Sequence, residues 1–361
     1  MGFDPNKPYN ALPGLPPKAD LETRAIMRKV VSAGRALAEL KGIGHTIPNQ
    51  AMLVNSLVLQ EARASSEIEN IITTDDALFR AFTAKTQRID PATKEVLRYR
   101  EALWDGYNAL GKRPLLTTNL FIDIVQSIKE NTAGIRKEPG VTIKNQATGE
   151  VIYSPPEGEN VIRDKLRNLE EFIHADDGID PLIKLPLVHY QFEAIHPFAD
   201  GNGRTGRIVN ILLLVQKELL DLPVLYLSKD IIERKNDYYR LLRNVTESRA
   251  WEPWILYMLD AVKSTANLTK QRILAIRELM QETIIKAKNE LPERVYSKEL
   301  IELLFRQPYT KIQFIVDAGI AKRQTAAEYL KELEKIKILE SLRIGKETLY
   351  LNLELFKLLS S

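Results

Sequence analysis

Apolar residues recur at helical spacing along most of this chain. The segment 21–42 places an apolar side chain every three or four positions and ends at Gly42, a residue type that favours helix ends. Residues 1–19 contain five prolines and are expected to form an extended arm. The same periodicity predicts further helices at 75–84, 92–110, 117–131, 161–174, 181–195 and 204–219.

The segment 48–74 predicts a helix whose apolar stripe has two polar members. Its positions lie three or four residues apart, and they are Ala51, Val54, Val58, Ala62, Ser65, Glu69 and Ile72. Glu69 is therefore expected on the apolar face. A carboxylate that faces inward needs a cationic partner, because an unpaired charge is costly to bury.

β-Structure is predicted in two places. Residues 141–153, VTIKNQATGEVIY, have β-branched residues on both sides of a turn-like segment and predict a hairpin. The helical pattern lapses at 289–294, and the residues beyond it predict three helices and two short strands, at 297–306, 310–317, 322–337 and within 338–352. That order resembles a winged helix. The expected fold class is mainly α, a helical domain with a β-hairpin flap and a C-terminal winged-helix domain.

The composition fits a chain with a sizeable core. Of the 361 residues 44% are hydrophobic, but no run of eighteen or more apolar residues occurs, so no membrane segment is expected. The first residues are polar and rich in proline, unlike a leader peptide. The absence of cysteine excludes disulfides and thiolate metal sites, and we expect a cytoplasmic protein. Because the net charge is only +3, any phosphate recognition has to be local.

Residues 196–207, HPFADGNGRTGR, combine groups that suit a nucleotide phosphate site. Gly201 and Gly203 permit backbone conformations in which successive N–H groups converge on an anion. The predicted helix that follows directs its positive N-terminal end at the same place. Arg204 and Arg207 lie three residues apart, on one face of the first turn, and each can grip phosphate with a planar fork of donors. Two such groups suit a di- or triphosphate.

Two further side chains of this segment supply chemistry. Asp200 immediately precedes the glycines and is positioned to hold Mg²⁺ against the same phosphate oxygens. His196 titrates in a range suited to taking a proton from an attacking hydroxyl. The segment lacks the lysine of a P-loop, GxxxxGK[ST], which excludes that class of nucleotide site.

The segment resembles the signature of the Fic family, HxFx[DE]GNGRxxR, with all eight fixed or restricted positions matched. The likeness is strong over residues 115–215. It implies transfer of a nucleotide moiety, most often AMP from Mg-ATP, to a Ser, Thr or Tyr hydroxyl of a target protein. By matching position, His196 would deprotonate that hydroxyl, Phe198 would anchor the loop and Asp200 would bind Mg²⁺.

The resemblance also implies roles for the remaining positions of the signature. The backbone of Gly201, Asn202 and Gly203 would form the anion hole, with Arg204 and Arg207 on the β- and γ-phosphates. A kinase-like branch of the superfamily has a different anion loop. Because GNGR is intact here, nucleotidyl rather than phosphoryl transfer is expected.

The hairpin at 141–153 would be the flap that clamps the target segment by strand addition. The resemblance implies that the target is a protein and that the chain itself can be a second acceptor. We expect four parts: an N-terminal arm and helices at 1–114, the catalytic core at 115–215, a helical completion at 216–289 and the winged helix at 290–361.

Residues 65–70, SSEIEN, resemble the inhibitory pattern of the same family, [ST]xxxE[GN], through Ser65 and Glu69. Together with the inward position expected for Glu69, this leads to a hypothesis of autoinhibition. Glu69 would pair with Arg207 when ATP is absent and prevent productive docking of the γ-phosphate.

Several alternatives stay open. Glu69 could be a surface acid paired with a basic residue such as Arg63, or it could orient a water that removes AMP from a modified protein. His189, Glu193 and His196 lie on one helical face and could form a metal-hydrolase triad, although the usual two-histidine motif is absent. We expect His189 and Glu193 to support packing instead.

Two other interpretations concern neighbouring parts of the chain. Tyr238 and Tyr239 either border the adenine or pack in the helical core. The winged helix could bind DNA, but residues 291–361 hold twelve Lys or Arg against ten Asp or Glu. Since DNA-binding domains are usually distinctly basic, nucleic acid is a possible but not a favoured partner.

Overall fold

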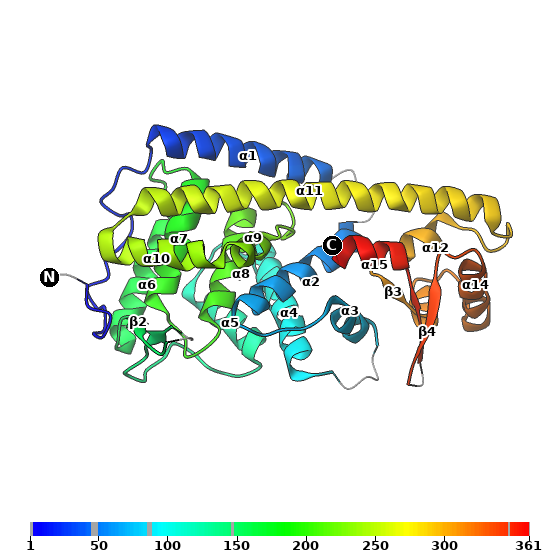
Figure 1. Ribbon diagram of the computed structural model, residues 1–361, viewed down its shortest axis with the longest axis horizontal. Helices are drawn as coiled ribbons and strands as arrows, with labels where there is room; N and C mark the ends of the chain where they lie inside the picture. The colour runs from blue at the N-terminus through cyan, green and yellow to red at the C-terminus, as the bar shows by residue number, and fades with distance from the viewer. Residues whose placement is uncertain (1–2, 45–49, 85–88, 146–147, 346, 361) are drawn as a thin grey trace.

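Two long helices run side by side along one edge of the molecule (Figure 1). α1 (Arg24–Gly44) packs along α11 (Trp251–Glu290), a helix of 40 residues that reaches from the helical domain to the C-terminal part. The computed structural model describes residues 3–44, 50–84, 89–145, 148–345 and 347–360, and for residues 50–54 it describes the backbone alone.

Within the described ranges, nine further helices build the domain below this pair (Figure 1). The predicted helices are confirmed, with ends that shift by a few residues. Their bounds are α2 (Gln50–Ile68), α3 (Asp75–Thr83), α4 (Pro91–Lys112), α5 (Thr118–Lys129), α6 (Glu159–His174), α7 (Pro181–Ile195) and α8 (Asn202–Gln216). α9 (Leu227–Glu233) and α10 (Lys235–Ser248) lie in the stretch 216–289, for which the sequence predicted a helical completion but no individual helices. No helix among the residues that the structure describes is long and apolar enough to cross a membrane.

α7 and α8 lie at the centre of this domain, and nearly all of their residues are buried. α7 begins where Asp180 accepts a hydrogen bond from the Leu182 N–H at 2.7 Å and Pro181 occupies the first turn. It ends where His196 takes a left-handed conformation, with φ of 49°. α8 starts directly after Gly201, so the segment between the two helices is held on both sides by the core.

A small antiparallel hairpin lies at one end of the domain, as the sequence predicts. β1 (Ile143–Lys144) pairs with β2 (Val151–Tyr153), and Ile143 faces Tyr153. The Tyr153 hydroxyl donates to the Ala194 carbonyl of α7 at 2.8 Å. The N-terminal arm packs on the same place, because the Tyr9 N–H donates to the Ser154 carbonyl at 2.9 Å and the rings of Tyr9 and Tyr153 meet edge to face. The base of the hairpin is thus fixed relative to α7.

The C-terminal part has the element order expected for a winged helix, with two additions. Its elements are α12 (Lys298–Leu303), β3 (Tyr309–Thr310), α13 (Ile312–Asp317), α14 (Arg323–Lys335), β4 (Glu340–Ile344), β5 (Glu347–Leu351) and α15 (Leu353–Ser360). The three strands form an antiparallel sheet in the order β3-β5-β4. The sequence did not predict the two-residue strand β3 or the final helix α15, which begins only two residues after β5.

The C-terminal part packs on α3 (Figure 1). The Tyr309 hydroxyl donates to Asp76 at 2.5 Å, and the Gln307 amide donates to the Thr83 hydroxyl at 3.0 Å. The ring of Phe356 lies 6.2 Å from that of Phe79. These contacts join α15 and β3 to the helix that follows the expected inhibitory segment.

The helical stripe predicted across 51–72 is wrong at its C-terminal end. α2 stops at Ile68, because Asn70 has a φ of 63° and the Ile71 N–H turns back to the Ser66 carbonyl at 3.0 Å. Glu69 therefore lies in the turn after the helix, and the side chain of Ile72 is 70% exposed. Val58, Ala62 and Ser65 are buried as expected. The side chains of Ala51 and Val54 lie outside the described residues.

Candidate active site

The side chain of Asn202 holds the segment between α7 and α8 through two hydrogen bonds to the backbone of that segment. Asn202 accepts a hydrogen bond from the Phe198 N–H and donates one to the Phe198 carbonyl, both at 2.8 Å. Phe198 is 1% exposed and packs near Phe192, so it anchors the loop in the core as the resemblance implies. The stapling role of the Asn202 side chain was not predicted, because the signature suggested only a backbone role for this residue.

His196 is held from the hairpin side by Arg136, a residue outside the signature. The Arg136 Nε donates to the His196 carbonyl at 2.7 Å, and its backbone N–H donates to the Pro197 carbonyl at 2.9 Å. Burial, together with the positive charge of Arg136, lowers the pKa of the His196 imidazole to about 4. The ring is therefore neutral near pH 7, which is the form that accepts a proton.

Two glycines open space at the start of α8. Gly201 has a φ of 81°, and a Cβ there would lie 3.1 Å from Val125. A Cβ on Gly203 would lie 2.5 Å from Glu69 Oε1 and 2.9 Å from Arg207 Nη1. The absent side chain of Gly203 therefore lets the Glu69 carboxylate reach Arg207 across the helix terminus.

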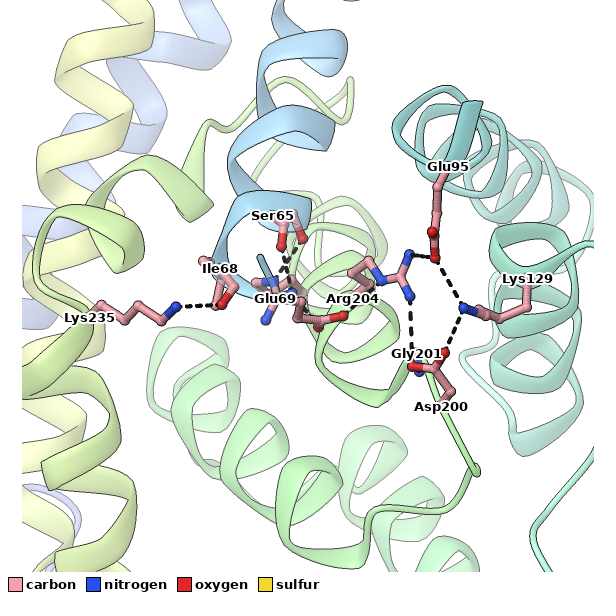
Figure 2. A network of polar contacts seen from close by, with 10 residues as sticks. Ser65, Ile68, Glu69, Glu95, Lys129, Asp200, Gly201, Arg204 and Lys235 are labelled. Atoms are coloured by element: carbon pink, nitrogen blue, oxygen red, sulfur yellow. Dashed lines mark hydrogen bonds and ion pairs between the residues drawn. The ribbon is translucent and has the colours of Figure 1, made fainter. Parts of the chain in front are cut away.

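Glu69 bridges both arginines of the signature, and Figure 2 labels it beside Arg204. Arg207 Nη2 donates to Glu69 Oε1 at 2.7 Å, and Arg204 Nε donates to Glu69 Oε2 at 2.9 Å. The pair with Arg207 agrees with the sequence-based hypothesis, whereas the pair with Arg204 was not predicted. Arg63, the alternative partner for Glu69, instead pairs with Asp75 at 3.2 Å.

The end of α2 is fixed next to these pairs. Ser65 accepts two hydrogen bonds from Arg207, one at its hydroxyl from Nε at 2.7 Å and one at its carbonyl from Nη2 at 2.8 Å. Lys235 of α10 donates to the Ile68 carbonyl at 2.6 Å (Figure 2). Although burial by itself lowers the pKa of Arg207, the charge of Glu69 raises it above its ordinary value, so the guanidinium stays ionised.

Two charged residues from other helices complete the network (Figure 2). Glu95 of α4 accepts from Arg204 Nη1 at 2.6 Å and pairs with Lys129 of α5 at 3.1 Å. Lys129 Nζ also lies 2.6 Å from Asp200 Oδ2. Arg204 Nη2 lies 3.9 Å from Asp200 Oδ1. Sequence patterns gave no sign of Glu95 and Lys129, because each is one charge among many on an amphipathic helix.

The network keeps these groups ionised near neutral pH. For Glu95 and Asp200, burial raises the pKa, but hydrogen bonds to Lys129, and for Glu95 also to Arg204, together with the charges of both groups outweigh it and the net pKa is lowered. For Lys129, burial lowers the pKa, but Asp200 and Glu95 outweigh it and the net pKa is raised. The proposed metal ligand, Asp200, is thus a carboxylate whose side chain remains 62% exposed.

The other face of α7 does not form the metal triad considered from the sequence. His189 Nε2 hydrogen-bonds the Tyr238 hydroxyl at 2.7 Å, and its ring stacks on Trp254. Burial raises the pKa of Glu193 to about 7, with a smaller opposing effect of Arg207. In the described ranges no three His, Asp or Glu side chains gather as a metal site would require. Tyr238 is buried, whereas its neighbour Tyr239 is 48% exposed.

The fold and the site together define a mainly helical protein in which a histidine and two buried arginines lie around the start of a central helix. Three family models match the chain: Fic/DOC family N-terminal over residues 27–108, Fic/DOC family over 115–214, and protein adenylyltransferase SoFic-like, C-terminal domain, over 279–355. The two Fic/DOC models together match half of the chain. The chain belongs to the Fic/DOC family.

Curated relatives match shorter stretches. A probable protein adenylyltransferase of Aquifex aeolicus is 39% identical over 69 residues, which cover 19% of this chain and 21% of the relative. The protein adenylyltransferase Fic of Drosophila yakuba is 26% identical over 144 residues, 39% of this chain and 27% of the relative. The matches thus span about a quarter or less of these relatives' length.

Solved structures show the same fold. A Fic family protein from Desulfovibrio desulfuricans superimposes with a TM-score of 0.57 at 20% identity, covering 91% of this chain and 96% of that chain. Fic-1 from C. elegans superimposes with a TM-score of 0.52 at 15% identity, covering 70% of this chain and 74% of that chain.

Proposed function

We propose that this chain transfers AMP from Mg-ATP to a Ser, Thr or Tyr hydroxyl of a target protein and restrains itself through Glu69. The observation that supports this best is the arrangement at the start of α8. A neutral histidine, a helix N-terminus and two buried arginines lie together, and a carboxylate of the same chain holds both arginines.

The reaction uses groups that the chain places side by side. The acceptor hydroxyl oxygen attacks the α-phosphorus of ATP, the bond to the bridging α–β oxygen breaks, and pyrophosphate leaves. The neutral imidazole of His196 takes the hydroxyl proton. The N–H groups at the start of α8 and the guanidinium groups of Arg204 and Arg207 stabilise the phosphate charge.

Asp200 fits a magnesium ligand in its chemistry. Its carboxylate is ionised and largely exposed, and Oδ1 accepts from the Gly201 N–H at 2.6 Å, which orients the group at the mouth of the anion site. Mg²⁺ takes one or two carboxylates together with phosphate oxygens and water. When bound, the ion would supply positive charge against the phosphates.

Glu69 restrains this reaction by occupying both phosphate-binding side chains. A γ-phosphate that docks on Arg207 has to displace the carboxylate, because the two compete for Nη2 and for the space beside Gly203. Such competition is worth about 1–3 kcal/mol, or roughly 5–150-fold in nucleotide handling.

The hairpin β1–β2 is the surface where we propose that a target segment docks. Its base is fixed to α7 through Tyr153, so a strand added to the hairpin is held at a set distance from the loop that carries His196. A segment of the chain itself that reaches this edge would serve as a second acceptor.

Labelled ATP tests the proposal. The Glu69→Gly protein incubated with ATP labelled at the α-phosphate should carry protein-bound label, whereas ATP labelled at the γ-phosphate should leave none. His196→Ala in the same background should abolish labelling. Glu67→Gly, which also places a glycine near the end of α2 but has no ion pair to either arginine among the described contacts, is the control and should label as weakly as the unsubstituted chain.

The outcomes separate the alternatives. Label from the γ-phosphate alone would indicate a kinase. Absence of label in Glu69→Gly would contradict AMP transfer. Release of AMP from a pre-labelled protein that requires Glu69 would favour the hydrolytic alternative.

A further inference from the structure

Arg204 is held from two sides by two different glutamates. Its side chain is 1% exposed, so each of its donors needs an acceptor within the protein. Nε faces Glu69, whereas Nη1 faces Glu95. The two carboxylates therefore bind different nitrogens of one guanidinium and do not compete with each other.

The two glutamates differ in how they are attached. Glu69 lies in the turn after α2, and it shares its carboxylate between Arg204 and Arg207. Glu95 lies on the second turn of α4, a helix of 22 residues that packs on both α5 and α8. Among the described contacts Glu95 touches Arg204 and Lys129 and has no contact with Arg207. Departure of Glu69 thus leaves the contact between Glu95 and Arg204 in place.

Lys129 joins this contact to the proposed metal ligand. Its ammonium lies 3.1 Å from Glu95 Oε1 and 2.6 Å from Asp200 Oδ2. The three carboxylates Glu69, Glu95 and Asp200 are balanced by Lys129, Arg204 and Arg207 (Figure 2). When Glu69 leaves, the site gains a net positive charge while Lys129 still neutralises Glu95.

We propose that Glu95 is a positioning residue of the nucleotide site, and that it holds Arg204 by Nη1 so that the Nε side is ready for phosphate oxygens once Glu69 has withdrawn. Lys129 keeps Glu95 in place. This inference rests on the proposed function. A guanidinium fixed in advance binds phosphate with less loss of side-chain freedom than one that must be ordered by the ligand.

Calorimetric titration of ATP tests the proposal. The titration uses the full chain with Glu69→Gly and contains no Mg²⁺, so that Asp200 does not act through a metal. Adding Glu95→Gln should weaken ATP binding about tenfold, the lower end of what outer partners contribute to a ligand-binding group. Lys129→Met should weaken it in the same direction, and Lys129→Arg, which keeps the charge, should restore it.

A matched control and a kinetic readout separate positioning from a general loss of structure. Glu130, at the end of α5, is an exposed glutamate that pairs with Lys94 and Arg98, and Glu130→Gln should leave ATP affinity unchanged. In AMP transfer assays with Mg²⁺, Glu95→Gln should raise KM for ATP and leave kcat nearly unchanged.

Two results would overturn the proposal. ATP binding that is equal or tighter in Glu69→Gly/Glu95→Gln than in Glu69→Gly would show that Glu95 does not position Arg204, or that it opposes phosphate. Absence of ATP binding in Glu69→Gly itself would contradict the proposed function, and the inference with it.

Discussion

At the residue scale, the site is a set of oppositely charged side chains that pair with one another, with both arginines buried and Asp200 exposed. Arg204 and Arg207 are 1% and 2% exposed, which is unusual for arginines and requires acceptors on every side. The acceptors come from α2, from the turn that follows it and from α4. Both guanidinium groups are therefore held in place by acceptors of the protein itself.

Glu193 is the exception to this balance and makes stability depend on pH. Burial raises the pKa of its carboxyl to about 7 from an ordinary 4.5, so between these values the folded chain binds more protons than the unfolded chain. Stability then falls as pH rises, by about 3 kcal/mol between pH 5 and pH 8. Glu193→Gln should remove this fall and unfold at a higher urea concentration at pH 8.

Urea denaturation at several pH values measures this effect. Glu171→Gln, on the exposed face of α6, is the control and should keep the pH dependence of the unsubstituted chain. If the free energy of unfolding fell equally with pH in the unsubstituted chain and in Glu193→Gln, the Glu193 carboxyl would not stay protonated in the fold.

At the element scale, the end of α2 contacts α8, and this contact holds the Arg207 side chain. Two adjacent serines of α2, Ser65 and Ser66, are both fully buried. Only the Ser65 hydroxyl accepts a bond from Arg207, whereas the Ser66 hydroxyl has no hydrogen-bond partner among the described residues. Substituting each serine in turn therefore separates the contribution of the Arg207 hydrogen bond to stability from the contribution of side-chain burial.

Ser65→Ala should lower the free energy of unfolding by about 1–3 kcal/mol, because it leaves a buried donor of Arg207 without its acceptor. Ser66→Ala should change it by less than about 1 kcal/mol, since no bond is lost. Thermal unfolding of the two variants at equal concentration gives the comparison. Equal losses of stability in the two variants would mean that the hydrogen bond between Ser65 and Arg207 adds nothing to the stability of the fold.

The sequence predicted most of the elements and the signature, but not the individual helices α9, α10 and α15, the strand β3 or the contacts between elements. The periodicity of apolar residues placed the helices of the main domain, and the hairpin followed from β-branched residues around a turn. The end of α2 was missed because Asn70 takes a left-handed conformation that a periodic stripe does not reveal.

Site residues outside the signature were missed for a related reason. Glu95, Lys129 and Arg136 act through contacts between segments that are distant in sequence, and a single sequence carries no signal for such pairs. Asn202 was assigned only its backbone role, because its side chain bonds to the loop of the same signature.

At the scale of the whole molecule, α11 connects the two ends. Its 40 residues correspond to about 60 Å of helix, and it packs against α1 and α7 at one end and against α12 and α15 at the other. The C-terminal part also rests on α3, which follows Glu69 by a few residues. The expected inhibitory segment 65–70 thus lies a few residues before the helix on which the C-terminal part packs.

Phe356→Ala should loosen the packing of the C-terminal part on α3, because the Phe356 ring packs near both Phe79 and Tyr309. For a partly buried phenylalanine we expect a loss of about 3 kcal/mol and faster proteolysis of α15. Lys357→Ala, an exposed neighbour on the same helix, is the control and should be cleaved at the original rate. Equal cleavage rates for both variants would show that the Phe356 ring does not hold α15 on α3.

The missing side chain at Gly203 limits which substitutions this site can tolerate. The same empty volume admits the Glu69 carboxylate and, under the proposed function, a phosphate group. Under the proposed function, a larger residue there would obstruct both the Glu69 carboxylate and the γ-phosphate. A substitution that relieves the restraint and keeps nucleotide binding is then expected in the segment that carries Glu69 rather than at Gly203.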